Sequence, residues 1–386
     1  MNTLNRIPVS SPASVAVFRR ILTHGPLGRI DVARATGLSQ SAVTKAVNPL
    51  IEAGFVVETI PDDRGELGVG RPVNPLAVAH GRAHIIGVKV TGTTTYGVLT
   101  DLSGVQIAFA TARNRAHDVR EIIDSIAEVV DQIRETNPGP AVDGLGVAIS
   151  GDVDRTAGII RDSPLLGWTD VPLRHLLETR LALPVTVEND VRALTIAEHL
   201  FGAGRDARSF AVVTIGEGIG CGLFVNGRIV DGAYGVSGEI GHLPLAPRDL
   251  VCSCGRHGCV ETVASTRAIV DRVRTATGMP DLEAADVIRL AHENHLPSIE
   301  AFEAAGEVIG AALAALINII GPERVIIAGE GALEYELYAD RLKSTIAEHA
   351  FGAAAKAELT LTKHTFFDWA LGAAVCVIEE IAAGSI

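Results

Sequence analysis

Aromatic residues are scarce in this sequence, at 4% of 386 residues, although hydrophobic residues make up 47%. The core must therefore be built mainly from aliphatic side chains. The 40 glycines allow many tight turns between strands and helices. This composition is typical of an α/β protein of two or three domains and argues against an aromatic-rich binding sandwich.

Long apolar runs are also lacking. No stretch approaches the ~18 uninterrupted apolar residues of a membrane span. Residues 1–20 do not contain the long apolar core of a signal peptide. We therefore expect a cytoplasmic protein with no membrane partner.

Positive charge is in deficit, because the formal net charge is −13. A protein that coats nucleic acid over its whole surface is thereby excluded. The charge is uneven, however: residues 1–80 carry +2 and the remaining residues −15. A slightly basic head on an acidic body suits a small DNA-reading module attached to a sensor that does not bind DNA.

The first 78 residues have the pattern of a winged helix-turn-helix. Ser11-Pro12 begins a helix, residues 29–36 form a short second helix, and Ser39 caps a third that runs to about Ala53. Strands at 55–58 and 73–78 flank a polar loop that forms the wing. Pro49 falls inside the third helix, where it removes a hydrogen bond and can kink the axis.

The exposed face of the third helix predicts a partner, double-stranded DNA. Its glutamine and asparagine can bond adenine edges, and its lysine suits a phosphate. Arg64 and Arg71 of the wing suit a narrow minor groove. The alternative is a three-helix module that binds protein. The predicted DNA-binding residues are Ser39, Gln40, Ser41, Thr44, Lys45, Asn48 and Arg71.

From about residue 84 onward, strands alternate with helices, which indicates α/β layers. The predicted strands are two within 84–99, then 105–111, 142–150, 185–187, 209–214, 222–225 and 324–328, and the predicted helices are 119–134, 191–200, 301–320 and 369–383.

Cysteines are few, but three of the five lie within eight residues, at 252, 254 and 259. Together with His242 they offer one imidazole and three thiolates, a closed set that suits structural, tetrahedral Zn²⁺. His257 is an alternative fourth ligand, and reduced cysteines without metal are the alternative to a site. Cys221 and Cys376 lie in apolar surroundings and are expected to be buried.

The block from Gly238 to Glu261, GEIGH followed by CxCGxxGCxE, resembles the ROK family (repressors, open reading frames and sugar kinases). The resemblance extends to VAISGDVD at 147–154, SPLLGW at 163–168 and END at 188–190. It implies a two-lobed actin/hexokinase-like, or ribonuclease H-like, sugar-kinase fold behind the winged helix. The implied domains are residues 1–82, a first lobe of 83–189 with 366–386, and a second lobe of 190–365.

The resemblance also implies a sugar site. Carboxylates and amides grip vicinal hydroxyls, and a metal fixes the imidazole tautomer of His242, which both ligates zinc and touches the sugar. In the family's kinases the residue matching Asp190 is the general base. Acids scattered over the surface are the alternative. The implied sugar ligands are Asn189, Asp190, Glu239, His242 and Glu261.

The nucleotide loops depart from the kinase pattern at three places. Lys89 stands where the first phosphate loop has an acid, and a lysine cannot organise Mg²⁺. Glu217 replaces the central residue of Gly-Thr-Gly, and Glu330 that of Gly-Gly-Gly, so two acids face the place of a polyanion. We therefore expect ATP binding to be lost. Leu165, where the family commonly has asparagine, can alter sugar preference.

Three functions remain. The first is a sugar-responsive transcriptional regulator, a repressor by family analogy, acting as a homodimer or tetramer on an operator. The second is an active sugar kinase with a DNA-binding head, which Asp190 favours and Lys89, Glu217 and Glu330 oppose. The third is an adaptor whose sensor body binds a protein and no sugar. The residues favour the first.

Overall fold

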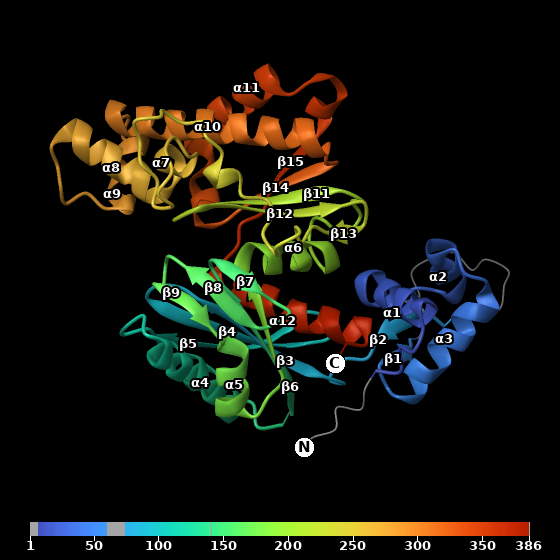
Figure 1. Cartoon of the computed structure of the whole chain (residues 1–386). Coiled ribbons are helices and arrows are strands. Elements are labelled where there is room, and N and C mark those ends of the chain that lie inside the picture. The colour runs from blue at the N-terminus through green and yellow to red at the C-terminus, as the bar shows by residue number, and fades with distance from the viewer. Residues whose placement is uncertain (1–6, 60–73, 140, 386) are drawn as a thin grey trace. The chain divides into compact units, whose positions relative to one another are not determined.

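The computed structural model describes residues 7–59, 74–139 and 141–385, and the chain divides into two compact units (Figure 1). The first unit comprises Met1–Phe201 and Phe366–Ile386, and the second comprises Gly202–Thr365. The second unit is thus an insertion between the two chain segments of the first.

The first unit begins with the three helices and the small antiparallel sheet of a winged helix. The side chains of Ser11 and Ser14 cap the start of the first helix reciprocally. Phe18 meets Phe55 edge-on in a buried core. The predicted wing, with Arg64 and Arg71, lies outside the described residues. The elements are α1 (Pro12–His24), α2 (Arg29–Thr36), α3 (Gln40–Glu52), β1 (Val56–Glu58) and β2 (Leu76–Val78).

α3 is one helix through Pro49, so the proline does not end it. The amide of Ala53 donates to the Pro49 carbonyl at 3.0 Å, which closes the last turn. Gly54 follows with φ +73°, a left-handed conformation that suits glycine at the end of a helix. The first part of α3 therefore keeps the regular geometry that a reading helix needs.

A five-stranded mixed sheet in the order β10-β6-β3-β4-β5 forms the centre of the first unit. α4 packs against β4 and β5 on one face, and α12 packs against β3 and β6 on the other (Figure 1). The elements are β3 (His84–Val90), β4 (Thr94–Asp101), β5 (Gln106–Arg113), α4 (Val119–Thr136), β6 (Val142–Ile149), β10 (Val185–Asn189) and α12 (Phe366–Ala383).

Two strand glycines let α12 lie directly on this sheet. A Cβ at Gly87 would lie 1.9 Å from the carbonyl oxygen of Ala370, and one at Gly146 equally close to that of Ala373. α6 (Asp190–Leu200) begins where β10 ends. Gly372 of α12 lies against the backbone of Ala193 in α6, so the two helices pack closely.

The segment between β6 and β10 forms a separate antiparallel sheet and a helix that the sequence pattern did not predict. It holds the SPLLGW motif and the part of VAISGDVD that follows β6. Its elements are β7 (Asp152–Asp154), β8 (Ile159–Ser163), β9 (Trp168–Val171) and α5 (Leu173–Leu181). Residues 190–201, assigned above to the second lobe, group with the first unit because α6 packs on α12.

The second unit is built on a sheet in the order β13-β12-β11-β14-β15, in which β11, β14 and β15 run parallel. The elements are β11 (Phe210–Ile215), β12 (Ile219–Val225), β13 (Arg228–Ile229), η1 (Ile240–His242), α7 (Glu261–Ala264), α8 (Thr266–Thr277), α9 (Ala284–His292), α10 (Leu296–Ile320), β14 (Arg324–Ala328), η2 (Glu330–Leu337), α11 (Ala339–His349), η3 (Gly352–Lys356) and β15 (Glu358–Leu361).

α10 is long and apolar enough to cross a membrane by length and composition alone. In this protein, however, it packs against α7, α8 and α11. Its buried residues, among them Phe302, Ile309 and Leu313, belong to the hydrophobic core of the second unit. The core helix of a soluble protein satisfies the same length and composition criteria.

The mixed α/β fold predicted from the sequence is confirmed.

Candidate functional site

The predicted reading face of α3 is exposed along its length. Ser39 caps the helix by accepting a hydrogen bond from the amide of Ala42 at 3.2 Å. Val43 and Val47 point into the winged-helix core and hold the opposite face outward. Gly37, with φ +70°, ends α2 and makes the tight turn between the two helices. The exposed predicted residues are Ser39, Gln40, Ser41, Thr44, Lys45 and Asn48.

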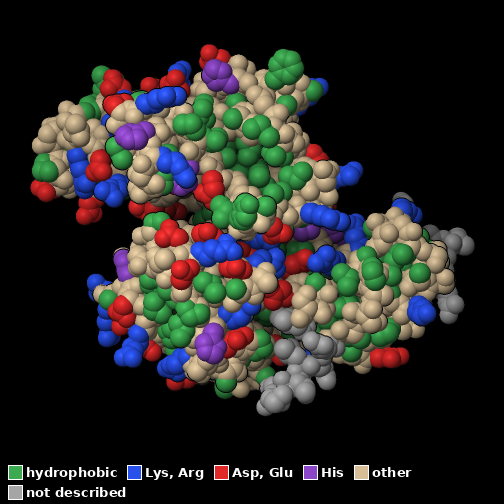
Figure 2. Space-filling model, in the orientation of Figure 1, with side chains coloured by type: hydrophobic (Ala, Val, Ile, Leu, Met, Phe, Trp, Pro, Cys, Tyr) green, Lys and Arg blue, Asp and Glu red, His purple; other side chains and the backbone are tan. Residues whose placement is uncertain are grey.

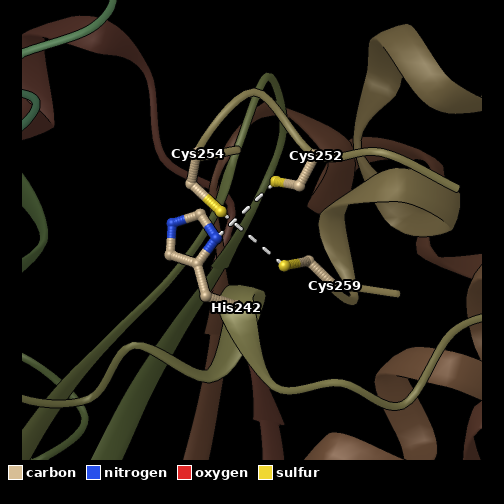
Figure 3. A group of neighbouring side chains, drawn as sticks. All are labelled: His242, Cys252, Cys254 and Cys259. Atoms are coloured by element: carbon tan, nitrogen blue, oxygen red, sulfur yellow. Dashed lines mark hydrogen bonds between the residues drawn. The ribbon is translucent and has the colours of Figure 1, made fainter. Parts of the chain in front are cut away.

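The four predicted metal ligands lie together in the second unit (Figure 3). Their ligand atoms all fall within 4.8 Å of one another. Cys254 Sγ lies 3.8 Å from Cys259 Sγ, and Cys252 Sγ lies 3.8 Å from His242 Nδ1. A tetrahedron with Zn–S bonds of about 2.3 Å has S···S edges of about 3.8 Å. The cluster can therefore hold a tetrahedral metal ion, with His257 outside the set.

Only one ring nitrogen of His242 faces the cysteines, and the other faces a carboxylate. Its Nδ1 faces the cysteines, whereas its Nε2 lies 3.9 Å from a carboxylate oxygen of Glu239. Glu261 approaches within 4.0 Å of Nδ1 and accepts a hydrogen bond from the amide of Ile219 at 2.9 Å. The structure thus brings together three of the five predicted sugar ligands, Glu239, His242 and Glu261.

The other two predicted sugar ligands lie in the first unit, at the junction of β10 and α6. Asn189 caps α6 through the amide of Arg192 at 3.0 Å and donates to the Gly151 carbonyl at 3.0 Å. Asp190 is buried and forms an ion pair with Lys89, which is itself buried on β3. The sequence did not reveal this pairing, since the two residues are 101 positions apart.

A carboxylate from another loop, that of Glu330, lies against the Gly216–Gly218 loop. Glu330 Oε1 accepts a hydrogen bond from the Glu217 amide at 2.9 Å, and a Cβ at Gly216 would lie 2.1 Å from the same oxygen. Partial burial and then the Glu330 charge raise the pKa of Glu217. Two acids therefore crowd one loop, and one of them already occupies a backbone donor of that loop.

Acidic and basic side chains are interspersed over the face of the protein shown in Figure 2. No large patch of one sign dominates that face. Charges of both signs are thus mixed on the face shown, without a field of a single sign.

The fold and the clustered residues define a class: a winged helix joined to an α/β fold of the sugar-kinase type, with a His/Cys₃ cluster in the second unit. The sequence matches the ROK family over residues 85–380, and the chain belongs to this family. The predicted resemblance is confirmed.

Curated relatives and solved structures agree with this assignment. The xylose repressor of Bacillus subtilis strain 168 is 28% identical over 87% of this chain and 86% of its own. The dual regulator NagC of Escherichia coli K12 is 31% identical over 82% and 80%. A ROK family transcriptional regulator, described as a homolog of the E. coli MLC protein, shares the fold with a TM-score of 0.81, 24% identity and 96% coverage of both chains.

Solved kinases of the family match a smaller share of this chain. A ROK family glucokinase from Streptomyces griseus, in complex with glucose and AMPPNP, is 26% identical with a TM-score of 0.66, and the match covers 76% of this chain and 98% of the kinase. The repressors, by contrast, match over more than 80% of this chain. The matches that cover more than 80% of this chain are to proteins named as regulators or repressors.

Proposed function

We propose that this chain is a sugar-responsive transcriptional regulator that binds an operator through α3 and a sugar through its sensor. The observation that carries the proposal is the joint presence of an exposed, capped α3 and the Glu239–His242–Glu261 cluster in one chain whose relatives are named sugar repressors. By analogy with those relatives it acts as a repressor, in the cytoplasm, as a homodimer or tetramer on paired half-sites.

In the DNA-bound state the cap Ser39 and the five predicted residues of α3 read the major groove. Gln40 and Asn48 suit adenine edges, and Lys45 suits a phosphate. Arg71 of the wing, outside the described residues, joins this set as a proposal from the sequence. The first 82 residues form the DNA-binding domain, and the rest of the chain forms the sensor.

The proposed sugar ligands are hydroxyl-binding groups. Carboxylates that accept hydrogen bonds from hydroxyls come from Glu239, Glu261 and Asp190, and an amide comes from Asn189. The Nε2 of His242 can donate or accept a hydrogen bond, depending on its protonation. Zn²⁺ on His242, Cys252, Cys254 and Cys259 fixes the imidazole orientation. The ion has no open position, so its contribution is structural.

The sensor has no kinase activity in this proposal. The buried carboxylate of Asp190 is paired with the ammonium of Lys89, a cation where the kinase pattern has an acid. Glu330 holds a backbone donor of the loop that cradles phosphate in a kinase, and Glu217 adds a second acid. A triphosphate brought to this loop would meet fixed negative charge rather than donors.

A thermal-shift screen tests the sugar site. D-xylose, N-acetyl-D-glucosamine and D-glucose are the first probes. A sugar that binds raises the melting temperature, because a ligand at 100 times its Kd stabilises the folded state by about 2.7 kcal/mol. The active sugar should lose its shift in Glu239→Gln and keep it in the matched control Glu300→Gln, an exposed acid on α10. Absence of a shift with every sugar and sugar phosphate would contradict the proposal.

Asp190 keeps a second function open, that of an active sugar kinase with a DNA-binding head. A coupled assay of sugar-dependent ATP turnover separates the two. The regulator proposal expects no turnover above background. Clear turnover that disappears in Asp190→Asn would replace it with the kinase.

A further inference from the structure

Glu188 is a buried acid beside the proposed sugar site that the site itself does not use. It precedes Asn189 on β10 and is 2% exposed. Its two oxygens accept hydrogen bonds from the Asn189 amide at 3.0 Å and from Arg192 Nε at 2.8 Å. Burial raises the pKa of this carboxyl group, and the arginines oppose that shift. Glu188 is therefore tied directly to the backbone that presents Asn189 and Asp190.

Arg155, in the turn after β7, is shared between two acids. Its Nε lies 3.5 Å from Glu188, and its Nη2 lies 3.6 Å from Glu380 on α12. Both distances exceed the ~2.8 Å of a charge-assisted hydrogen bond. The guanidinium thus joins Glu188 of β10 to Glu380 of α12 through two long ion pairs.

The C-terminal part of α12 extends this set of charges to the winged helix. Glu380 accepts a hydrogen bond from Thr186 Oγ1 at 2.9 Å, which anchors it to β10. The neighbouring Glu379 forms an ion pair with Arg19 of α1. Partial burial raises the pKa of Glu379, and the charges of Arg19 and Arg155 act against this.

α6 forms a second connection between the same two places. It begins at Asp190, and His199 lies in its last turn. Burial, followed by the charges of Arg19 and His24 of α1, lowers the pKa of His199 to about 4. One helix thus has a proposed sugar ligand at its first residue, and near its other end a histidine whose pKa is affected by the charges of α1.

We propose that Glu188, Arg155, Glu380, Glu379 and Arg19 form a charge network that couples the sugar-binding end of β10 and α6 to α1 of the winged helix. The proposal rests on the proposed function, since it assigns the two coupled ends to an effector and to DNA. A sugar that draws Asn189 and Asp190 toward it moves Glu188. The distances from Arg155 to Glu188 and to Glu380 then change. As a result, the ion pair between Glu379 of α12 and Arg19 of α1 is strengthened or weakened.

The physical reason for sensitivity is charge balance. Three acids and three arginines (counting Arg192) share the network, so a small displacement that leaves one buried charge unpaired is unfavourable and shifts the rest. Such coupling requires that each ligand favours one arrangement over the other, and it must act equally in both directions.

The reciprocal direction can be tested without sugar or DNA. Hydrogen exchange is measured in the full-length chain at the amides of Val191 and Arg192, which bond to the side chains of Asp190 and Asn189. Arg19→Met should speed their exchange at least threefold. Arg34→Met, which removes an exposed arginine paired with Asp31 on α2, is the control and should leave it unchanged.

A charge-swapped pair distinguishes coupling from general loosening. Arg19→Glu combined with Glu379→Arg should restore the wild-type exchange rates, whereas either single change should not. Unchanged exchange in Arg19→Met, or no rescue by the swapped pair, overturns the network. Because neither result depends on an effector, failure of the proposed function and failure of the network are distinguishable.

The forward direction uses the sugar found by thermal shift and a DNA duplex selected by the chain from a random library. Arg155→Met should reduce the ratio of DNA affinities with and without sugar to below twofold, while sugar binding stays within threefold. Arg161→Met, which removes an arginine paired with Asp152 and Asp154 of β7, is the control and should keep the wild-type ratio. An unaltered ratio in Arg155→Met overturns the proposal.

Discussion

At the scale of single residues, Lys89 illustrates what one substitution does to a site. It is 5% exposed, pairs with Asp190, and places its ammonium 5.2 Å from the centre of the Trp369 ring. The carboxylate that a kinase keeps available is thus fixed within an ion pair. The sequence showed that Lys89 departs from the family pattern, but not which group pairs with it, because that depends on a contact between β3 and the start of α6.

His199 provides a pH prediction at the same scale. Its pKa of about 4 in the folded protein, lowered from 6.5 by burial and by Arg19 and His24, means that the unfolded chain binds the proton more tightly. The contribution of His199 to the free energy of unfolding is therefore complete above pH 6.5 and is lost as the pH falls toward 4. Between pH 7.5 and 5 the wild type should lose about 2 kcal/mol more than His199→Gln.

Urea unfolding at the two pH values measures that difference. Between pH 7.5 and 8.5 both proteins should change alike, because His199 is uncharged in both states there. Equal losses on acidification would show that His199 protonates as easily in the folded protein as in the unfolded chain.

At the scale of elements, the packing of α12 on the central sheet depends on strand glycines. Gly146→Ala places a methyl group 1.9 Å from the Ala373 carbonyl oxygen, which is backbone and cannot turn aside. We expect a loss of about 1–3 kcal/mol or more from overpacking. Gly139→Ala has no atom within 4 Å of its new Cβ and is the control. Equal midpoints in urea for the two variants would contradict this packing.

Many of the regular elements were predicted from the sequence, but the helices α5, α8, α9 and α11 and several short strands were not. The caps at Ser11 and Ser39 placed α1 and α3, and the buried runs placed β3, β6 and β14. The short strands β7, β8 and β9 were missed because their pattern is mixed polar and apolar. α10 begins at Leu296 rather than at 301, and Pro297 in its first turn was the signal available.

The candidate site divides in the same way. The His/Cys₃ cluster was predictable because its ligands are close in sequence and chemically distinctive. The bond between Glu330 and the Glu217 amide was not, since it joins loops 113 residues apart. The network from Glu188 to Arg19 also follows from tertiary contacts alone.

At the scale of the whole molecule, the metal cluster ties the loop before α7 to η1 in the second unit. We expect one zinc per chain, and its removal by a chelator should lower the melting temperature by several degrees, because a structural ion stabilises only the folded arrangement. Cys252→Ser should lose the metal and melt like the stripped protein. Ser253→Ala, in the same loop, should retain both properties. A wild-type chain without metal would contradict the site.

The central claim is that sugar binding changes DNA binding in this chain. The most direct measurement is the anisotropy of a labelled duplex, selected by the chain from a random library, titrated with full-length protein with and without saturating sugar. We predict that the two dissociation constants differ by at least fivefold, within the usual range of allosteric coupling. Equal dissociation constants with a sugar that demonstrably binds, or no preference for the selected duplex over random DNA, would contradict the account.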